Sequence, residues 1–213
     1  MTKPSILRRR HLLLGSVAIQ LPLSAAHAAN LVPTPSQTEG PFYPAGLPAD
    51  SDNDLVQVRG QQARAMGEVL HLQGRVIGVD GRPLAGTLVE IWQCDALGVY
   101  DHALQPARDR RDAAFQGYGR VLADADGRYS FRTLKPVPYP GRAPHIHLKA
   151  ATGEGRRLTS QFYIAGEPQN ARDIVFRAVA RDPRQRERIE MRLVPASGIE
   201  PGAIATTMDI VIV

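Results

Sequence analysis

Cysteine is nearly absent from this 213-residue chain: Cys94 is the only one, so no disulfide can form within the chain. Stability must therefore come from a buried core, which a chain of this length with 43% hydrophobic residues is large enough to form. Cys94 lies in the motif EIWQCD, without a neighbouring histidine that could activate its thiol. We expect a buried and chemically inert side chain rather than a nucleophile.

Acidic residues are absent from residues 1–28, which contain Lys3 and three consecutive arginines, Arg8, Arg9 and Arg10. These four account for most of the formal net charge of +5, because the rest of the chain has 22 basic and 21 acidic residues. A nearly neutral body lacks the basic excess that binding to a phosphate backbone requires. We therefore expect no nucleic-acid partner.

Residues 1–28 have the three parts of an export signal: a basic start, the apolar run HLLLGSVAIQLPL and a small-residue cleavage motif, AHA. The consecutive arginines before the leucine run resemble a twin-arginine signal, and a general secretory signal is the alternative. Either route predicts an exported protein, periplasmic or secreted. Repeats and further membrane-spanning apolar runs are absent, so we expect no membrane partner once the signal is removed.

The remaining chain divides into an extended arm, residues 29–69, and a domain, residues 70–213. The arm is rich in proline and glycine, which disfavours helix. In the domain, short alternating segments flank two Asp-Gly turns, at 80–81 and 126–127, and predict two antiparallel hairpins. Similar segments continue to the end, and only residues 171–180 indicate a short helix. The predicted fold is all-β: an antiparallel β-sandwich with long loops and an extended N-terminal arm.

The motif RAPHIHLK places His145 and His147 two residues apart on a predicted strand, where alternate side chains share one face. Two imidazoles so placed can bind one cation, although an H-x-H pair is also compatible with ordinary half-buried residues. Tyr100 and Tyr139 lie where the neighbouring segments run into loops. A phenol beside a strongly charged cation becomes an anionic oxygen ligand, and two phenolates favour a hard trivalent ion, Fe(III). Alternatively, each tyrosine is a strand-end or turn aromatic.

Four blocks of the chain, in this order, resemble the intradiol ring-cleavage catechol dioxygenase family, and within it the protocatechuate 3,4-dioxygenase branch. The similarity runs from TPSQTEGPFYP to about SQFYIAGEP, residues 34–168, which is most of the chain that remains after the predicted signal. The blocks are GRVIGVDGRPLAGTLVEIWQCDALGVYDH, GRVLADADGRYSFRTLKPVPYP, RAPHIHLK and LTSQFYIAGEP.

This resemblance implies a non-haem Fe(III) enzyme that uses O2 to cleave a small aromatic diol between its two hydroxylated carbons, giving a cis,cis-muconate-type diacid. It implies that the iron ligands are Tyr100, Tyr139, His145 and His147, together with solvent hydroxide. It further implies that Tyr139 is the ligand that leaves when substrate binds, that Arg142 and Gln161 face the substrate, and that Pro41 and Tyr43 line the pocket.

One departure from the family concerns the substrate. Only Pro140 and Gly141 separate Tyr139 from Arg142, where the large protocatechuate enzymes have a longer insertion, so we expect a more open mouth. The sequence does not select one catechol, and an assembly of identical or different chains is compatible with it.

Two other functions fit a β-sandwich. In a transthyretin-like binding module the four ligand-type residues would be incidental. In a zinc-dependent hydrolase, His145 and His147 would join a carboxylate such as Asp101.

Overall fold

The computed structural model describes residues 30–213, so the export signal predicted for residues 1–28 lies outside the described residues. The described part is mostly β-structure with two short α-helices. The strands are β1 (Val69–Gly78), β2 (Leu88–Trp92), β3 (Tyr118–Leu122), β4 (Arg128–Leu134), β5 (His145–Ala151), β6 (Arg157–Ile164), β7 (Glu190–Met191), β8 (Val194–Pro195), β9 (Ile204–Thr207) and β10 (Ile210–Ile212), and the helices are α1 (Ile174–Val179) and α2 (Pro183–Glu187).

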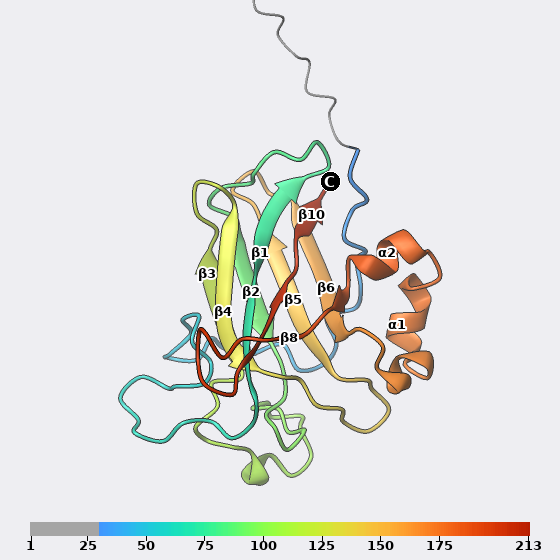
Figure 1. The fold of residues 1–213 in the computed structure, drawn as a ribbon. Coiled ribbons are helices and arrows are strands. Elements are labelled where there is room, and N and C mark those ends of the chain that lie inside the picture. Colours follow the sequence, from blue (N-terminus) through green and yellow to red (C-terminus); the bar gives the residue numbers. More distant parts are fainter. Residues whose placement is uncertain (1–29) are drawn as a thin grey trace, which may run out of the picture.

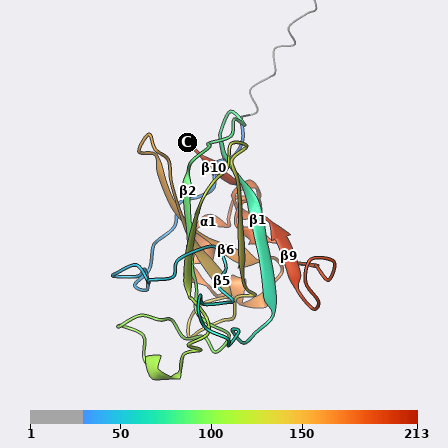
Figure 2. The ribbon, with the colours of Figure 1, turned by 90° about the vertical axis from the view of Figure 1, so that its left-hand side faces the viewer.

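The strands form two sheets packed as a sandwich, which confirms the predicted fold class (Figure 1). In the first sheet, β1 pairs antiparallel with β4 along one edge and parallel with β9 and β10 along the other. The second sheet has the order β3-β2-β5-β6-β7, and there only β7 joins in parallel. Figure 2 shows the sheets side by side, with β1 and β9 in one and β2 and β5 in the other. The sandwich thus contains parallel pairs that the sequence pattern did not indicate.

Alternating residues of the strands build the core between the sheets. Val89 and Ile91 of β2 and Ile146 and Leu148 of β5 are fully buried in one cluster with residues of β1 and β4. Burial of each such side chain contributes about 1.5–3 kcal/mol. The inward direction of Ile146 and Leu148 fixes the direction of their neighbours in β5, because successive side chains of a strand point to opposite faces.

The outer face of the second sheet is buried as well, under residues 30–51 of the arm. Backbone N–H groups join this segment to the sheet: Gln37 donates to the carbonyl of Thr159 in β6 (2.9 Å), and Arg120 of β3 donates to the carbonyl of Ser51 (3.0 Å). In Figure 1 this segment, coloured blue, runs alongside β6. The second sheet therefore has two buried faces, one against the core and one under the arm.

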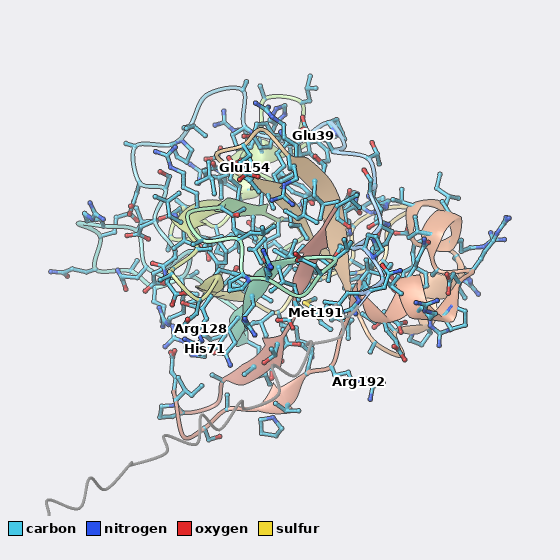
Figure 3. The ribbon with its side chains drawn as sticks, turned by 90° about the horizontal axis from the view of Figure 1, so that it is seen from above. Glu39, His71, Arg128, Glu154, Met191 and Arg192 are labelled. Carbon is cyan, nitrogen blue, oxygen red and sulfur yellow. The ribbon has the colours of Figure 1, made fainter. Side chains whose placement is uncertain are left out.

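Figure 3 shows the arm and the first sheet on opposite sides of the sandwich. Glu39 of the arm forms an ion pair with Lys149 of β5, whereas His71 of β1 lies on the other side. The outer face that carries His145 and His147 is the one beneath the arm.

The two predicted hairpins are wrong, although both Asp-Gly turns form. Gly81 and Gly127 have φ values of +80° and +74°, which glycine adopts without strain. The strands that flank each turn, however, belong to different sheets: β1 pairs with β4, and β2 pairs with β3 and β5. Each turn reverses the chain, but the flanking apolar faces pack across the sandwich rather than pairing edge to edge.

The helix predicted within residues 171–180 is confirmed as α1, and α2 follows it with Asp182 as N-cap and Pro183 in the first turn. Figure 1 shows both helices beside β6. Between Asn30 and Val213, no helix is long and apolar enough to cross a membrane.

Gly74 offers a test of the packing between β1 and the β9–β10 junction. A Cβ added there would lie 1.8 Å from the carbonyl oxygen of Met208, which is backbone and which also accepts a hydrogen bond from Tyr129 (2.6 Å). We predict that Gly74→Ala lowers the free energy of unfolding by about 1–3 kcal/mol, the usual cost of overpacking. Urea denaturation measures this. As the control, Gly153→Ala meets no atom within 4 Å and should change stability by less than about 0.5 kcal/mol; equal losses for the two variants would contradict the packing argument.

Candidate metal centre

His145 and His147 lie side by side on β5, each only 1% exposed. Their Nε2 atoms are 3.1 Å apart, and the Nδ1 of His145 is 2.6 Å from the carbonyl oxygen of Ala143. With its Nδ1–H donating to that carbonyl, His145 directs an Nε2 lone pair toward His147. Two ring nitrogens at this distance either share a proton or bind a common cation.

Burial keeps both imidazoles neutral. Desolvation, with a further contribution from the positive charge of Arg142, lowers the pKa of His145 to about 4. The pKa of His147 lies well below its ordinary value, again chiefly because of burial and then because of the neighbouring His145. Neutral imidazoles are the form that binds metal ions.

Tyr100 and Tyr139 come from the loops that follow β2 and β4, which lie at the same end of the sandwich (Figure 1). Their ring centroids are 5.5 Å apart, Tyr139 is 5.5 Å from His145, and Tyr100 is 6.2 Å from His147. The structure thus brings the four predicted ligand side chains together in one cluster of rings.

The two tyrosines differ in their surroundings. Tyr100 is 2% exposed and its hydroxyl finds no hydrogen-bond partner within residues 30–213, whereas Tyr139 is half-buried and its hydroxyl accepts from Nη1 of Arg142 (3.3 Å). Burial raises the pKa of both phenols, so neither ionises at neutral pH without a cation nearby.

Local turns explain why both tyrosines face the histidines. The buried carboxylate of Asp95 accepts the backbone N–H groups of Leu97 (2.8 Å) and Val99 (2.9 Å), and this bend leads directly into Tyr100. Tyr139 opens a tight turn in which Gly141 has φ +82° and the N–H of Arg142 donates back to the carbonyl of Tyr139 (3.0 Å).

Neighbouring groups fix the imidazole of His147. The indole of Trp92 stacks on it at 4.7 Å with an interplanar angle of 10°. Gly40 of the arm also lies next to the imidazole ring. A Cβ at Gly40 would lie 3.3 Å from Cε1 of His147, and its φ of +71° also favours glycine. The arm therefore needs this residue type where it passes the histidine.

Arg142 connects the cluster to its surroundings through three side chains besides Tyr139. Its Nε donates to Oδ2 of Asp173 (2.8 Å), and its Nη2 donates to Oε1 of Gln161 (2.6 Å) and to the hydroxyl of Tyr163 (3.2 Å). These three hydrogen bonds hold the guanidinium of Arg142 in its orientation toward Tyr139.

Gln161 lies opposite His147 in the β5–β6 pairing and is fully buried. Its Nε2 donates to the carbonyl of Thr38 in the arm (2.9 Å), which leaves Oε1 as the acceptor facing Arg142. The amide thereby orients the arginine and ties the arm to the sheet.

The cluster fits a metal ion. The hydroxyl of Tyr100 is buried without a partner among residues 30–213, and the two Nε2 atoms face each other, an arrangement that is costly for neutral groups alone. Within residues 30–213 there is no group of three or more His, Cys, Asp or Glu side chains that could hold a metal. A cation here would therefore need the phenol oxygens as well as the imidazoles.

This composition contradicts the zinc-hydrolase alternative. Asp101, the carboxylate expected to complete a zinc site, is exposed. Its Oδ1 accepts a hydrogen bond from Nε of Arg108 (2.8 Å) and forms an ion pair with Nε of Arg111 (3.3 Å). It does not join the two histidines in a metal-binding group.

Pro41 and Tyr43 were expected to line the pocket. Pro41 is exposed, and Tyr43 donates its hydroxyl to Glu90 (2.9 Å) while its ring packs edge-on against Trp92 at 5.0 Å. Between them, Phe42 stacks on Tyr100 at 4.5 Å. The arm residue in contact with a predicted ligand is thus Phe42, and a pocket role for Pro41 and Tyr43 stays a prediction.

Sequence reasoning missed Asp173 and Tyr163 as well as Phe42. Asp173 caps α1 by accepting the N–H groups of Val175 (2.9 Å) and Phe176 (3.0 Å), a role that an aspartate before a helical pattern indicates. Its second oxygen reaches Arg142, 31 residues away, and no local signal predicts that. Tyr163 could have been expected from strand alternation, since it shares the face of Gln161.

A cavity of about 460 Å³ lies beside Tyr139 and Arg142, where the short turn through Pro140 and Gly141 forms part of the wall. Gln169 and Arg172 line another part of it. Of the four predicted ligands only Tyr139 lines this cavity, so the expected open mouth stays a prediction.

Comparison with known proteins agrees with this geometry. The family model described as "Dioxygenase" matches residues 38–200. The chain is 37% identical over 155 residues to the protocatechuate 3,4-dioxygenase beta chain of Burkholderia cepacia (68% of this chain, 66% of the relative) and 34% identical over 161 residues to catechol 1,2-dioxygenase 2 of Acinetobacter lwoffii (67% and 55%). It thus spans between about half and two thirds of the length of these relatives.

Solved structures show the same fold. The dioxygenase domain of a dioxygenase and carbohydrate-binding protein fusion from Streptomyces sp. SirexAA-E is 33% identical, with a TM-score of 0.65 over 84% of this chain and 97% of that chain. An intradiol ring-cleavage dioxygenase from Tetranychus urticae is 19% identical, with a TM-score of 0.66 over 85% and 94%, and supports the fold alone. The family model matches three quarters of this chain's residues, so the chain belongs to the intradiol dioxygenase family.

Proposed function

We propose that this protein is an intradiol ring-cleavage dioxygenase that holds Fe(III) and uses O2 to open a catechol-type ring between its two hydroxylated carbons, giving a cis,cis-muconate-type product. The observation that carries the proposal is the cluster of two neutral imidazoles and two phenols, in which the hydroxyl of Tyr100 is buried and has no partner in the described part of the chain. Export to the periplasm or medium, and an assembly with like or unlike chains, are parts of the proposal that rest on the sequence.

The donor set supports ferric iron. Phenolates are hard, anionic oxygen donors and suit a hard trivalent cation better than Zn²⁺ or Cu⁺. The residues that would hold the ion are Tyr100, Tyr139, His145 and His147. Bound Fe(III) supplies the Lewis acidity that activates a catecholate toward O2.

The different surroundings of Tyr100 and Tyr139 support different roles for them. Tyr100 is enclosed and stacked against Phe42, which keeps its oxygen in place. Tyr139 is half-buried and borders the cavity, so its Oη can move toward solvent and take up a proton from an incoming catechol hydroxyl. Nη1 of Arg142, 3.3 Å from that oxygen, is placed to stabilise negative charge on the phenolate or on the substrate.

A metal-free binding module accounts less well for the cluster. Each buried polar atom left without a partner costs about 1–3 kcal/mol, and a module without metal gains nothing in return. The zinc alternative lacks its carboxylate. Oxygen uptake with a panel of catechols, with products analysed for opening between the hydroxyls, tests the proposal directly.

The first prediction from the proposed function concerns iron binding. Tyr100→Phe removes one oxygen and keeps the ring, so the reconstituted variant should lose the visible ferric–phenolate absorption of Tyr100 and bind iron at least about tenfold more weakly, since even outer-shell losses cost that much. Metal analysis and the absorption spectrum measure both effects. Tyr129→Phe is the control, because Tyr129 is equally buried but its hydroxyl donates to Met208. A colourless wild-type protein after iron loading would overturn the proposal.

The second prediction separates Arg142 from the ligands. Arg142→Ala should retain iron and the visible absorption but lose about 10²–10³-fold in kcat, the usual effect of removing a charge-stabilising donor. Because Asp173 would then be buried without its counter-charge, Arg142→Lys serves as a second variant that keeps this charge and loses the forked contacts to Gln161 and Tyr163. Retained kcat in both variants with intact folding would assign Arg142 a structural role only.

The third prediction concerns Asp173 and pH. Burial alone would raise the pKa of this carboxyl, but the N–H groups of Phe176 and Ala143 and the Arg142 guanidinium outweigh burial and lower it. A lowered pKa stabilises the fold above the unfolded-state value near 4 and the stabilisation disappears as the pH falls below it. Asp173→Asn keeps the helix cap and should cost about 1.5–3 kcal/mol at pH 7, with a smaller difference at pH 3.

Urea midpoints of wild type and variant at both pH values measure this. Asp182→Asn is the matched control, because Asp182 caps α2 without a buried arginine partner and asparagine caps equally well. A difference between wild type and Asp173→Asn that is the same at pH 7 and pH 3 would show that the charge on Asp173 does not matter.

A further inference from the structure

Glu90 of β2 is a buried acidic residue that the proposed function does not use. It is 8% exposed, and its Oε1 accepts the hydroxyls of two tyrosines, Tyr43 of the arm (2.9 Å) and Tyr118 of β3. Burial, and then the neighbouring Glu90, raise the pKa of Tyr43 to about 12, so its hydroxyl keeps its proton and remains a donor at neutral pH. Glu90 therefore joins the arm to the sheet beneath it through the hydroxyl of Tyr43.

Two further side chains of the second sheet hold the ring of Tyr43. The Nζ of Lys149 lies 3.4 Å from the centroid of this ring, a cation–π contact, and Trp92 packs edge-on against the ring at 5.0 Å. Glu90 and Trp92 share the outer face of β2 and lie opposite Lys149 and His147 of β5. The strand register thus places the attachment of Tyr43 next to Trp92, which stacks on His147.

The stretch of arm that ends at Tyr43 covers two of the four proposed iron ligands. Gly40 lies against the imidazole of His147, and Phe42 stacks on the ring of Tyr100 at 4.5 Å with an interplanar angle of 23°. Both ligand side chains are buried. Displacement of this stretch would uncover both rings on the side of the arm.

Tyr43 is the last attachment of this stretch to the sheet. Before it, the carbonyl of Thr38 accepts from Gln161 (2.9 Å). After it, the next hydrogen bond between arm and sheet within residues 30–213 is the one that Ser51 accepts from β3 (3.0 Å). Without the hydroxyl of Tyr43, residues 40–50 would have no hydrogen bond to the sheet in the described chain. The arm residues in this part that border a cavity of about 190 Å³ are Phe42, Pro44, Gly46 and Pro48.

We propose that Glu90 is a positioning residue of the metal centre. Through Tyr43 it keeps the covering stretch of the arm, residues 40–43, over two of the iron ligands and thereby slows the loss of bound iron. Groups that support metal ligands from outside the coordination shell typically change metal affinity by about 10–100-fold. This inference rests on the proposed function, since it needs iron held by these ligands.

The experiment follows the loss of iron from the reconstituted protein to excess EDTA through the decay of the ferric–phenolate absorption. Tyr43→Phe keeps the ring and removes only the hydroxyl, and it should release iron about tenfold faster than wild type. Tyr118→Phe is the matched control, because its hydroxyl binds the same oxygen of Glu90 but lies on β3 and not on the arm. This control should release iron at the wild-type rate.

Two variants of Glu90 test whether Tyr43 acts through this side chain. Glu90→Gln keeps an acceptor oxygen and should release iron at close to the wild-type rate. Glu90→Leu has no acceptor and should release iron as fast as Tyr43→Phe. The double variant Glu90→Leu with Tyr43→Phe should be no faster than either single variant, since both remove the same contact.

The fluorescence of Trp92, the only tryptophan of the chain, reports on the arm without iron. Its indole is 1% exposed and contacts Tyr43 and His147, so displacement of the arm should shift the emission to longer wavelength and increase quenching by acrylamide. Metal-free Tyr43→Phe should show both changes, and metal-free Tyr118→Phe should show neither.

Equal iron-release rates in wild type and Tyr43→Phe, or unchanged Trp92 emission in this variant, would overturn the role of Glu90. Equal acceleration in Tyr43→Phe and Tyr118→Phe would also overturn it, because a general loss of stability would then explain the effect. Failure of the proposed function is distinguishable, since wild-type protein would then take up no iron and develop no ferric–phenolate absorption.

Discussion

The register between β5 and β6 is the constraint on which the metal centre depends. In the observed pairing His145 lies opposite Tyr163 and His147 opposite Gln161, so both histidines and both of these partners share the outer face. A slip of one residue in β5 would turn His145 and His147 toward the core and Ile146 and Leu148 toward the outer face. That slip is prevented from the inside, because Ile146, Leu148 and Phe162 are fully buried in the core. Burial of the apolar side chains of β5 thus determines the face on which His145 and His147 lie.

A sheet buried on both faces creates a difficulty that the arm resolves. Strand alternation places polar side chains on the outer face, and covering them removes them from water. The arm supplies the missing partners for some of them: Thr38 accepts from Gln161, Gln37 accepts from the backbone of Gln161, and Glu39 pairs with Lys149. The hydroxyl of Tyr100 receives no such partner from residues 30–213, and the free energy of this unsatisfied group favours the binding of a cation. The stability of the metal-free protein and its affinity for metal are therefore opposed.

The sequence allowed the β-class, the H-x-H pair and its outward direction to be predicted, because all three follow from the period of two in a strand. It did not allow the pairing of strands to be predicted. The Asp-Gly turns at Gly81 and Gly127 are local features and form as expected, but partner choice depends on which apolar faces meet across the sandwich. The ion pair between Arg142 and Asp173 was beyond reach for the same reason: only the folded chain places α1 next to the turn after Tyr139.

Arg142 and Arg172 show how burial decides what an arginine can do. Both guanidiniums line the same cavity, but Arg142 is anchored by Asp173, Gln161 and Tyr163 and has little freedom left. Such a group is pre-organised, so it can stabilise charge at one fixed point without reorganising during the reaction. Arg172 is exposed and forms no ion pair within residues 30–213, so solvent screens its charge and any interaction it makes is weaker than one made by Arg142.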